Sequence, residues 1–353
     1  MRGHVALDIK PDEGTVRTAL TLASLAPSVH NSQPWRWVLA GDAIELHADR
    51  RRWLPSTDPD STALLVSCGI ALHHATLAFA ADGWATDVAH VPDPTDPDHL
   101  ATLRFRPTEL DPAVIQLVGA IPSRRSDRRR FGPRRPSAAT IDELTRVARR
   151  AGAAAAVVDY GRFVGHLSAV GDDILHRDDD PGYLAELDHA TWLYTRYATG
   201  IPASSRLTGG ADDGLNRVFP PGTLADVSDD DAAELVVLGV RSNRPPGTPP
   251  DGPVDPVHQA VGAVVTGEAC GAVLLEAAAL GLSTCVVSRP FERAELRAAV
   301  ADLLDDDVVP HVLIRVGYCA SAQPIPPTPR RPLSELLDRP AIRAADTRPR
   351  RTR

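Results

Sequence analysis

Two pairs of matching apolar patterns within the 353 residues constrain the fold more than any other feature of this sequence. A shift of 125 residues places the helix-like pattern at 15–26 on the pattern at 140–151 without a gap. A shift of 198 residues places 69–83 on 267–281, and a glycine begins and ends each stretch. Since 198 − 125 = 73, the second copy carries 73 extra residues, which we place at about 170–255. The shared order of elements predicts a chain made of two related halves.

Local patterns support an α+β chain. Composition is typical of a globular protein, with 43% hydrophobic and 24% charged residues. Apolar spacing and stop signals predict helices at 14–26, 61–81, 112–121, 140–150 and 267–280. Alternating or short apolar runs predict strands at 37–39, 44–47, 86–91, 100–106, 283–287 and 311–317. We expect a first half at 1–110, a second half at 111–340 and a basic tail at 341–353.

Charge and cysteine usage exclude several classes of protein. Lys10 is the single lysine among 38 basic residues, so almost every cation is a permanently charged guanidinium. The net charge of −8 disfavours nucleic-acid and anionic-membrane binding. Four scattered cysteines form neither a disulfide framework nor a metal motif, and no apolar leader precedes Lys10. Apolar stretches are interrupted before they reach membrane-spanning length, so we expect a cytoplasmic protein without a membrane helix.

Two segments carry candidate chemistry. The first is the loop Pro27-Ser28-Val29-His30-Asn31, which follows a predicted helix, and the second is Arg124-Arg125-Ser126, which opens a stretch of seven arginines that ends at Arg135. Forked guanidinium groups with a serine hydroxyl suit a phosphate. Taken alone, the loop is also typical of an ordinary turn. The arginines alone are also typical of a solvated surface or an RNA-binding patch. No P-loop, GxGxxG, GxSxG, HExxH or other metal-ligand spacing occurs, so we expect no metal site.

Together with 267–284 and the tail at 317–333, these segments resemble the nitroreductase-like FMN flavoproteins. The resemblance is to the Acg-type branch, in which two copies of the fold are fused in one chain. It implies an intramolecular pseudo-dimer of mixed sheets flanked by helices, and therefore a monomer. In the homodimeric family, FMN lies between subunits, with an Arg-Arg-Ser segment of one subunit on the phosphate and a Pro-Ser-x-x-Asn loop of the other beside the flavin.

Only one such composite site is complete in this sequence. The second half supplies the Arg-Arg-Ser segment and the first half supplies the loop, whereas the reciprocal loop position, 152–156, has no polar side chain. The resemblance thus implies one FMN per chain. The implied cofactor-binding residues are Pro27, Ser28, His30, Asn31, Arg124, Arg125, Ser126, Arg128, Ser288, Arg289, Arg330 and Arg331.

The function implied by the resemblance is an FMN-dependent oxidoreductase. NAD(P)H is the expected donor, and a nitroaromatic, a quinone or another conjugated small molecule is the expected acceptor, with the flavin rather than a protein acid or base at the centre of the chemistry. Two alternatives stay open. The insertion could close over the flavin and make a storage protein with little turnover, or the flavin could serve a biosynthetic dehydrogenation.

Overall fold

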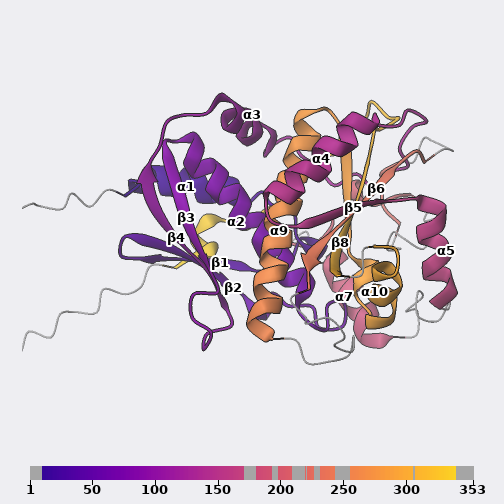
Figure 1. Ribbon diagram of the computed structural model, residues 1–353, viewed down its shortest axis with the longest axis horizontal. Helices are drawn as coiled ribbons and strands as arrows, with labels where there is room; N and C mark the ends of the chain where they lie inside the picture. The colour runs from indigo at the N-terminus through magenta and orange to yellow at the C-terminus, as the bar shows by residue number, and fades with distance from the viewer. Residues whose placement is uncertain are drawn as a thin grey trace, which may run out of the picture.

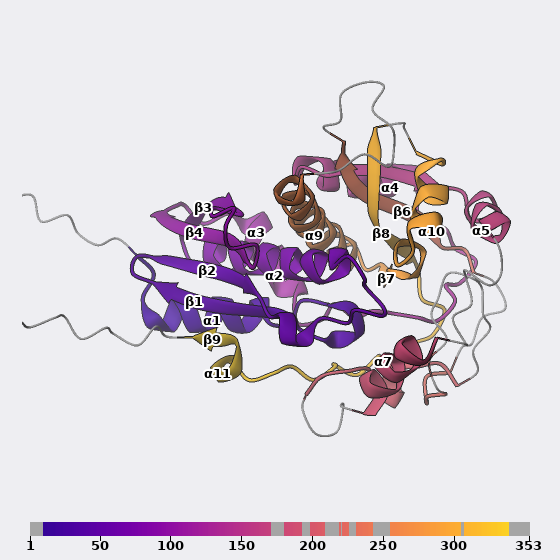
Figure 2. The same cartoon turned by 90° about the horizontal axis from the view of Figure 1, so that it is seen from below.

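The computed structural model describes residues 10–170, 180–192, 198–208, 219, 221–225, 231–242, 255–304 and 307–338 (Figure 1). The first half contains α1 (Glu13–Ala23), β1 (Trp35–Ala40), β2 (Ala43–Ala48), α2 (Thr62–Ala81), β3 (Trp84–His90) and β4 (His99–Pro107). Helix α3 (Pro112–Ala120) leads into the second half, which contains α4 (Ala138–Arg150), β5 (Ala154–Val158), α5 (Tyr160–Val170), α7 (Pro181–Trp192), β6 (Glu234–Arg241), α9 (Pro256–Ala279), β7 (Ser283–Val287), α10 (Ala294–Ala301) and β8 (Val308–Gly317). The chain then returns to the first half, where it forms α11 (Leu333–Leu336) and β9 (Leu337–Asp338) (Figure 2). The expected basic tail at 341–353 lies outside the described residues.

The two halves have sheets of the same strand order. The first sheet runs β3-β4-β2-β1-β9 and the second runs β7-β8-β6-β5, so the four strands of each half follow the order 3-4-2-1. Strand β9 pairs parallel with β1, which makes the first sheet mixed, whereas the strands of the second sheet pair antiparallel. The prediction of an α+β fold with sheets flanked by helices is confirmed.

The extra residues of the second half lie between its first two strands. Two residues, 41–42, separate β1 from β2, whereas 75 residues, 159–233, separate β5 from β6. The difference, 75 − 2 = 73, equals the difference between the two sequence shifts. The range expected for the insertion, about 170–255, also contains β6, which pairs with β5 and β8 in the interior of the second sheet. We therefore call 159–233 the inserted segment.

The two sheets differ in how many of their faces are covered (Figures 1 and 2). Burial alternates along β1 and β2, because α1 and α2 cover one face of the first sheet. In the second sheet, α4 and α9 pack on one face, and α5 and α10 pack on the other. Strands β6 and β8 are consequently buried over nearly their whole length, and the inserted segment supplies part of the second layer.

Capping residues set where several helices begin. The Ser137 hydroxyl accepts a hydrogen bond from the amide of Thr140, so α4 starts two residues before the predicted position. Asp12 caps α1 in the same way, and Asp111 precedes a proline at the first position of α3.

Helices α2 and α9 cross in the centre of the molecule with their backbones in contact (Figure 1). A Cβ atom added at Gly69 would lie 2.1 Å from the carbonyl oxygen of Val264, and one added at Gly267 would lie 2.2 Å from that of Val66. The shift of 198 residues converts Val66 to Val264 and Gly69 to Gly267. The two contacts are therefore equivalent, as they are across a two-fold interface between identical subunits.

By length and composition, α2 and α9 could each cross a membrane, contrary to the sequence expectation that no apolar stretch is long enough. Most of the apolar window of each helix is nevertheless buried inside the protein, 72% in α2 and 67% in α9. Buried core helices of soluble proteins can have the same length and apolar composition as membrane-spanning helices. The mutual packing of α2 and α9 accounts for their apolar character.

We predict that Gly267→Ala destabilises the protein by about 3 kcal/mol, because the added methyl group must displace a backbone oxygen rather than a flexible side chain. Gly119→Ala in α3 is the matched control, since a Cβ there meets nothing within 4 Å and alanine favours the helix by about 0.5–1 kcal/mol. Urea unfolding of both variants measures the difference. Equal stabilities would contradict the close crossing.

A second prediction concerns pH. Nε2 of His90 on β3 lies 2.7 Å from a carboxylate oxygen of Glu268 on α9, and this hydrogen bond raises the pKa of His90. The stabilisation is fully present below the unfolded-state pKa of about 6.5 and is lost as pH rises through the higher folded-state pKa. The difference in unfolding free energy between wild type and Glu268→Gln should therefore shrink as pH increases. A difference that stays constant from about pH 6 to about pH 9 would contradict a titrating pair.

Candidate functional site

Two adjoining cavities, which we call chambers, lie between the halves. The apolar chamber has an empty volume of about 840 Å³, which includes open solvent, and lies among α2, the 27–30 loop, β7 and the start of β8. The cationic chamber has an empty volume of about 660 Å³, which also includes open solvent, and lies among the same loop, the 121–128 segment and the tail at 325–330. Pro27, Ser28, Ser126 and Arg128 line both chambers. The combined space suits one extended small molecule.

The 27–31 loop has an unusual backbone. His30 and Asn31 have φ values of 49° and 54°, a region that costs energy for residues other than glycine. The hydroxyl of Ser28 accepts a hydrogen bond from the amide of Gln33 at 2.9 Å, and the amide of Val29 donates to the Ser67 hydroxyl of α2 at 3.2 Å. These bonds hold the strained loop against α2 at the junction of the two chambers.

Asn31 connects this loop to two distant parts of the chain. Its amide nitrogen donates at 3.1 Å to the carbonyl of Gly200 in the inserted segment and at 3.1 Å to the carbonyl of Pro329 in the tail. Asn31 thus fixes the loop, the inserted segment and the tail relative to one another beside the cationic chamber.

Three arginines meet in the cationic chamber. Arg124 is buried and Arg330 is partly buried, and burial together with the charge of neighbouring arginines lowers the pKa of Arg124 to about 10 and that of Arg330 to about 9. Burial also lowers the pKa of Arg125. Within the described part of the chain, no carboxylate pairs with any of the three, and Nε and Nη1 of Arg124 and Nε of Arg330 have no hydrogen-bond partner.

Backbone carbonyls hold this cluster in place. Arg330 donates to the carbonyls of Leu25 at 3.0 Å and Ala26 at 3.2 Å, and Arg125 donates to those of Pro122 at 2.7 Å and Ile325 at 3.3 Å. Neutral acceptors orient the guanidinium groups without cancelling their charge. Buried and uncompensated cations of this kind call for an anion.

Two further arginines of the same stretch, the candidate Arg128 and its neighbour Arg129, have partners within the protein. Arg128 donates to the carbonyl of Ser205 at 3.3 Å, and its guanidinium lies 5.4 Å from the centre of the Phe219 ring. Arg129 forms two buried hydrogen bonds with Asp127, at 2.9 and 2.8 Å, and is therefore neutralised within the protein. Both residues help to fix the 124–131 segment.

Arg331 lies outside both chambers, although the sequence placed it beside Arg330 in the clamp. It forms ion pairs with Glu335 at 3.3 Å and Asp49 at 3.9 Å and lines a third cavity. Successive side chains of an extended segment point to opposite sides, so Arg330 and Arg331 cannot face the same chamber.

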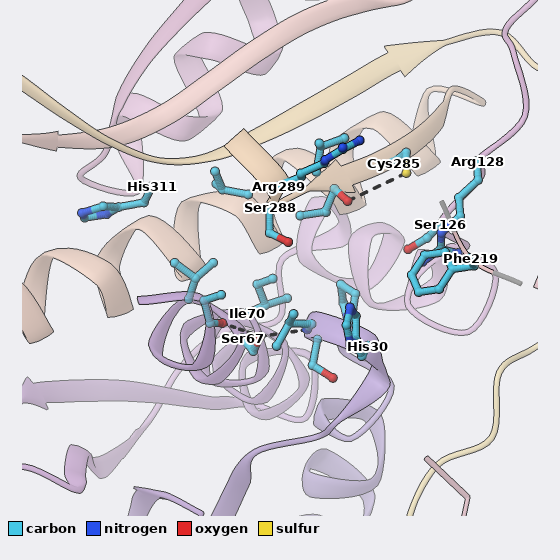
Figure 3. A pocket seen from close by; sticks show the side chains of 18 residues that line it. His30, Ser67, Ile70, Ser126, Arg128, Phe219, Cys285, Ser288, Arg289 and His311 are labelled. Atoms are coloured by element: carbon cyan, nitrogen blue, oxygen red, sulfur yellow. Dashed lines mark hydrogen bonds between the residues drawn. The ribbon is translucent and has the colours of Figure 1, made fainter. Parts of the chain in front are cut away.

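The remaining candidates lie in the apolar chamber (Figure 3). Ser126 forms a parallel bridge with Thr284, and the amide of Asp127 donates to the Thr284 carbonyl at 2.8 Å, which fastens the arginine segment to β7. Ser288 and Arg289 follow β7 and line the chamber opposite His30. Of the twelve predicted residues, eleven line one or both chambers.

Sequence reasoning missed several lining residues. His311 hydrogen-bonds through Nδ1 to the hydroxyl of Thr266 at 2.9 Å, and burial lowers its pKa to about 4, so it is neutral near pH 7. Phe219 lies edge-on to His30 with ring centres 5.7 Å apart. Phe219 belongs to the inserted segment, as do Ile201 and Ser205 of the cationic chamber. No pattern in the sequence connects that segment to the loop.

A scan against protein-family models gives no match. A search of curated proteins gives close relatives in Mycobacterium tuberculosis strain H37Rv. "Putative NAD(P)H nitroreductase Rv3131" is 36% identical over 94% of this chain and 93% of its own length. "Putative NAD(P)H nitroreductase acg" is 31% identical over 94% of this chain and 97% of its own length.

Solved structures are more distant. The FMN and NADPH-dependent nitroreductase NfnB from Sphigopyxis sp. strain HMH is 19% identical over 63% of this chain and 97% of its own, with a TM-score of 0.38. A nitroreductase with bound FMN from Bacteroides fragilis NCTC 9343 is 14% identical over 59% of this chain and 90% of its own, with a TM-score of 0.36. On the extent of its identity to Rv3131 and acg, the chain belongs to the NAD(P)H nitroreductase family.

Proposed function

We propose that the chain is an FMN-dependent oxidoreductase that binds the FMN phosphate in the cationic chamber and the isoalloxazine ring in the apolar chamber. The observation that carries this proposal is the cluster of Arg124, Arg125 and Arg330, of which Arg124 is buried and none pairs with a carboxylate among the described residues. A phosphate monoester brings about two negative charges and three strong acceptor oxygens. It therefore supplies both the charge and the hydrogen-bond acceptors that these guanidinium groups lack.

The apolar chamber fits the rest of the cofactor. Val66 and Ile70 of α2 and Val286 and Val312 of the second sheet offer apolar surface to a ring, and Ser28 and Ser126 offer hydroxyls at the junction of the chambers. Bound FMN supplies hydride acceptance and two-electron transfer. The protein's part is to hold the phosphate, exclude water from the ring and present Arg128 and Arg289, cations that favour the anionic reduced form.

One FMN per chain follows from an asymmetry between the halves. Eleven residues, 24–34, join α1 to β1 and include the loop, whereas three residues, 151–153, join α4 to β5. The second half thus has too short a connection for an equivalent loop. With the matching strand orders and the equivalent contacts of α2 and α9, this supports a fused pseudo-dimer that acts as a monomer with one complete site.

NAD(P)H is the proposed donor, in keeping with the names of Rv3131 and acg, and a nitroaromatic, a quinone or another conjugated molecule is the proposed acceptor. Stacking of donor or acceptor on the ring needs an open face above the apolar chamber. The protein is proposed to act in the cytoplasm, where both pyridine nucleotides and reduced thiols are available.

A storage function is the second candidate, because Phe219 lies against His30 and Arg128 at the edge of the apolar chamber. If the inserted segment keeps the ring covered, the protein holds FMN without turning over. The two functions differ in whether a pyridine nucleotide reaches the ring.

Anaerobic titration separates these functions. The purified protein, reconstituted with FMN, should hold one equivalent of FMN per chain. Addition of NADPH or NADH should then rapidly bleach the visible absorption bands of the bound flavin. Flavin that stays oxidised would favour storage. A protein that does not retain FMN would contradict both functions, and two equivalents per chain would contradict the single site.

We predict that Arg124→Met weakens FMN binding about 10- to 100-fold, because a charge-assisted hydrogen bond contributes about 1.5–3 kcal/mol. The same change should leave the stability of the FMN-free protein equal or higher, since it removes a buried cation that has no partner. Arg17→Met, at an exposed position on α1, is the control and should alter neither property. Fluorescence titration with FMN and thermal unfolding without it measure the two effects. Loss of stability without loss of affinity would assign Arg124 a structural role.

A further inference from the structure

The uncovered face of the first sheet carries a cluster of potential metal ligands that is separate from both chambers. Side chains alternate along β2, and because Ile44 and Leu46 are buried in the core, Glu45 and His47 lie on the opposite face. His99 begins the neighbouring strand β4 (Figure 2). One ligand atom from each of the three side chains lies within 4.8 Å of the other two. We call these residues the Glu45 cluster.

An irregularity in strand pairing builds this cluster. Glu45 pairs with Thr102 and Leu46 with Ala101, but His47 then pairs with His99 rather than with Leu100. Regular alternation would place the apolar Leu100 beside His47 on the outer face. The shift instead buries Leu100 completely and brings the imidazole of His99 next to that of His47. Bulges commonly re-aim side chains at functional sites.

The three side chains lie close to one another. Nε2 of His47 lies 3.0 Å from a carboxylate oxygen of Glu45, and the two imidazole rings stack with centres 4.6 Å apart and planes inclined by 15°. Nε2 of His99 lies 2.9 Å from the hydroxyl of Thr102. The His47 and Glu45 side chains are only 12% and 25% exposed, so the cluster is partly shielded from water.

A neighbouring arginine is already paired with a carboxylate outside the cluster. Arg36 on β1 is opposite His47 in the register, but its guanidinium forms an ion pair with Asp338 of β9 at 2.6 Å. The Glu45 carboxylate therefore remains available to balance part of the charge of a bound cation.

We propose that the Glu45 cluster binds one Zn²⁺ ion through two imidazole nitrogens and one carboxylate oxygen. Imidazole and carboxylate together suit zinc, whose bonds to nitrogen and oxygen are about 2.0–2.2 Å long. Zinc binding therefore requires side-chain rotations that converge the three ligand atoms, which lie within 4.8 Å of one another, on a common centre. Three protein ligands leave one tetrahedral position for water. No metal site is expected from the sequence, because His99 lies on a different strand from Glu45 and His47 and no short spacing connects it to them.

Zinc and cobalt binding to the full chain test the proposal. After treatment with EDTA, the FMN-loaded protein is titrated with Zn²⁺ by calorimetry and with Co²⁺ by visible absorption, a spectroscopic stand-in for zinc. We expect one ion per chain. Glu45→Gln and His99→Asn should each weaken binding by at least about 100-fold, because losing a direct ligand costs more than losing an outer partner, which costs about 10- to 100-fold.

His166→Asn, a change on α5 far along the chain from the cluster, is the matched control and should bind zinc like wild type. Circular dichroism and FMN content verify that each variant is folded. If His99→Asn does not fold, Glu45→Gln provides the test of the cluster. No zinc binding by wild type, or undiminished binding by the folded cluster variants, overturns the proposal. Neither result bears on the FMN site, which shares no residue with the cluster.

Discussion

The direct backbone contact between α2 and α9 is the constraint on which the rest of the molecule depends. It requires Gly69 and Gly267, because any side chain at either position would collide with a carbonyl oxygen of the opposing helix. Val66, whose carbonyl abuts Gly267, also lines the apolar chamber. The position of this wall of the chamber therefore depends on how closely the two helices approach. A change that separates them would reshape the proposed flavin site before it reached any residue of the cationic chamber.

The cationic chamber contains guanidinium groups that no carboxylate among the described residues neutralises. Burying a guanidinium group is costly, and three in one cavity also repel one another. The protein tolerates this arrangement because backbone carbonyls from the 25–26 turn, from Pro122 and from the tail accept hydrogen bonds without adding negative charge. Arg129, which lies in the same segment, illustrates the contrast, because the carboxylate of Asp127 balances its charge. A bound phosphate therefore meets donors that are already oriented, which lowers the cost of binding it.

Much of the fold could be predicted from the sequence, because helix periodicity and gapless shifts are local signals. The matched glycines at 69 and 267 indicated the equivalent helices, and they are also the residues in contact. The end of the insertion was harder to place, since β6 is preceded by acidic and proline-rich sequence that resembles a loop. Eleven of the twelve candidate site residues line the chambers because their motifs are contiguous. Phe219, His311 and the Glu45 cluster depend on contacts between distant segments, and no spacing in the sequence encodes such contacts.

The path of the tail has a consequence for the order in which the site is completed. Arg330 reaches the cationic chamber only because the chain leaves the second half after β8, crosses to the first half and adds β9 to the edge of β1 (Figure 2). The loop at 27–31, by contrast, precedes Arg330 along the chain by most of both halves. The cationic chamber therefore cannot be complete until the tail has been synthesised and has returned to the first half. If this chamber binds the cofactor phosphate as we propose, cofactor capture follows the joining of the two halves by the returning strand, and occupancy of the chamber marks chains in which that step has taken place.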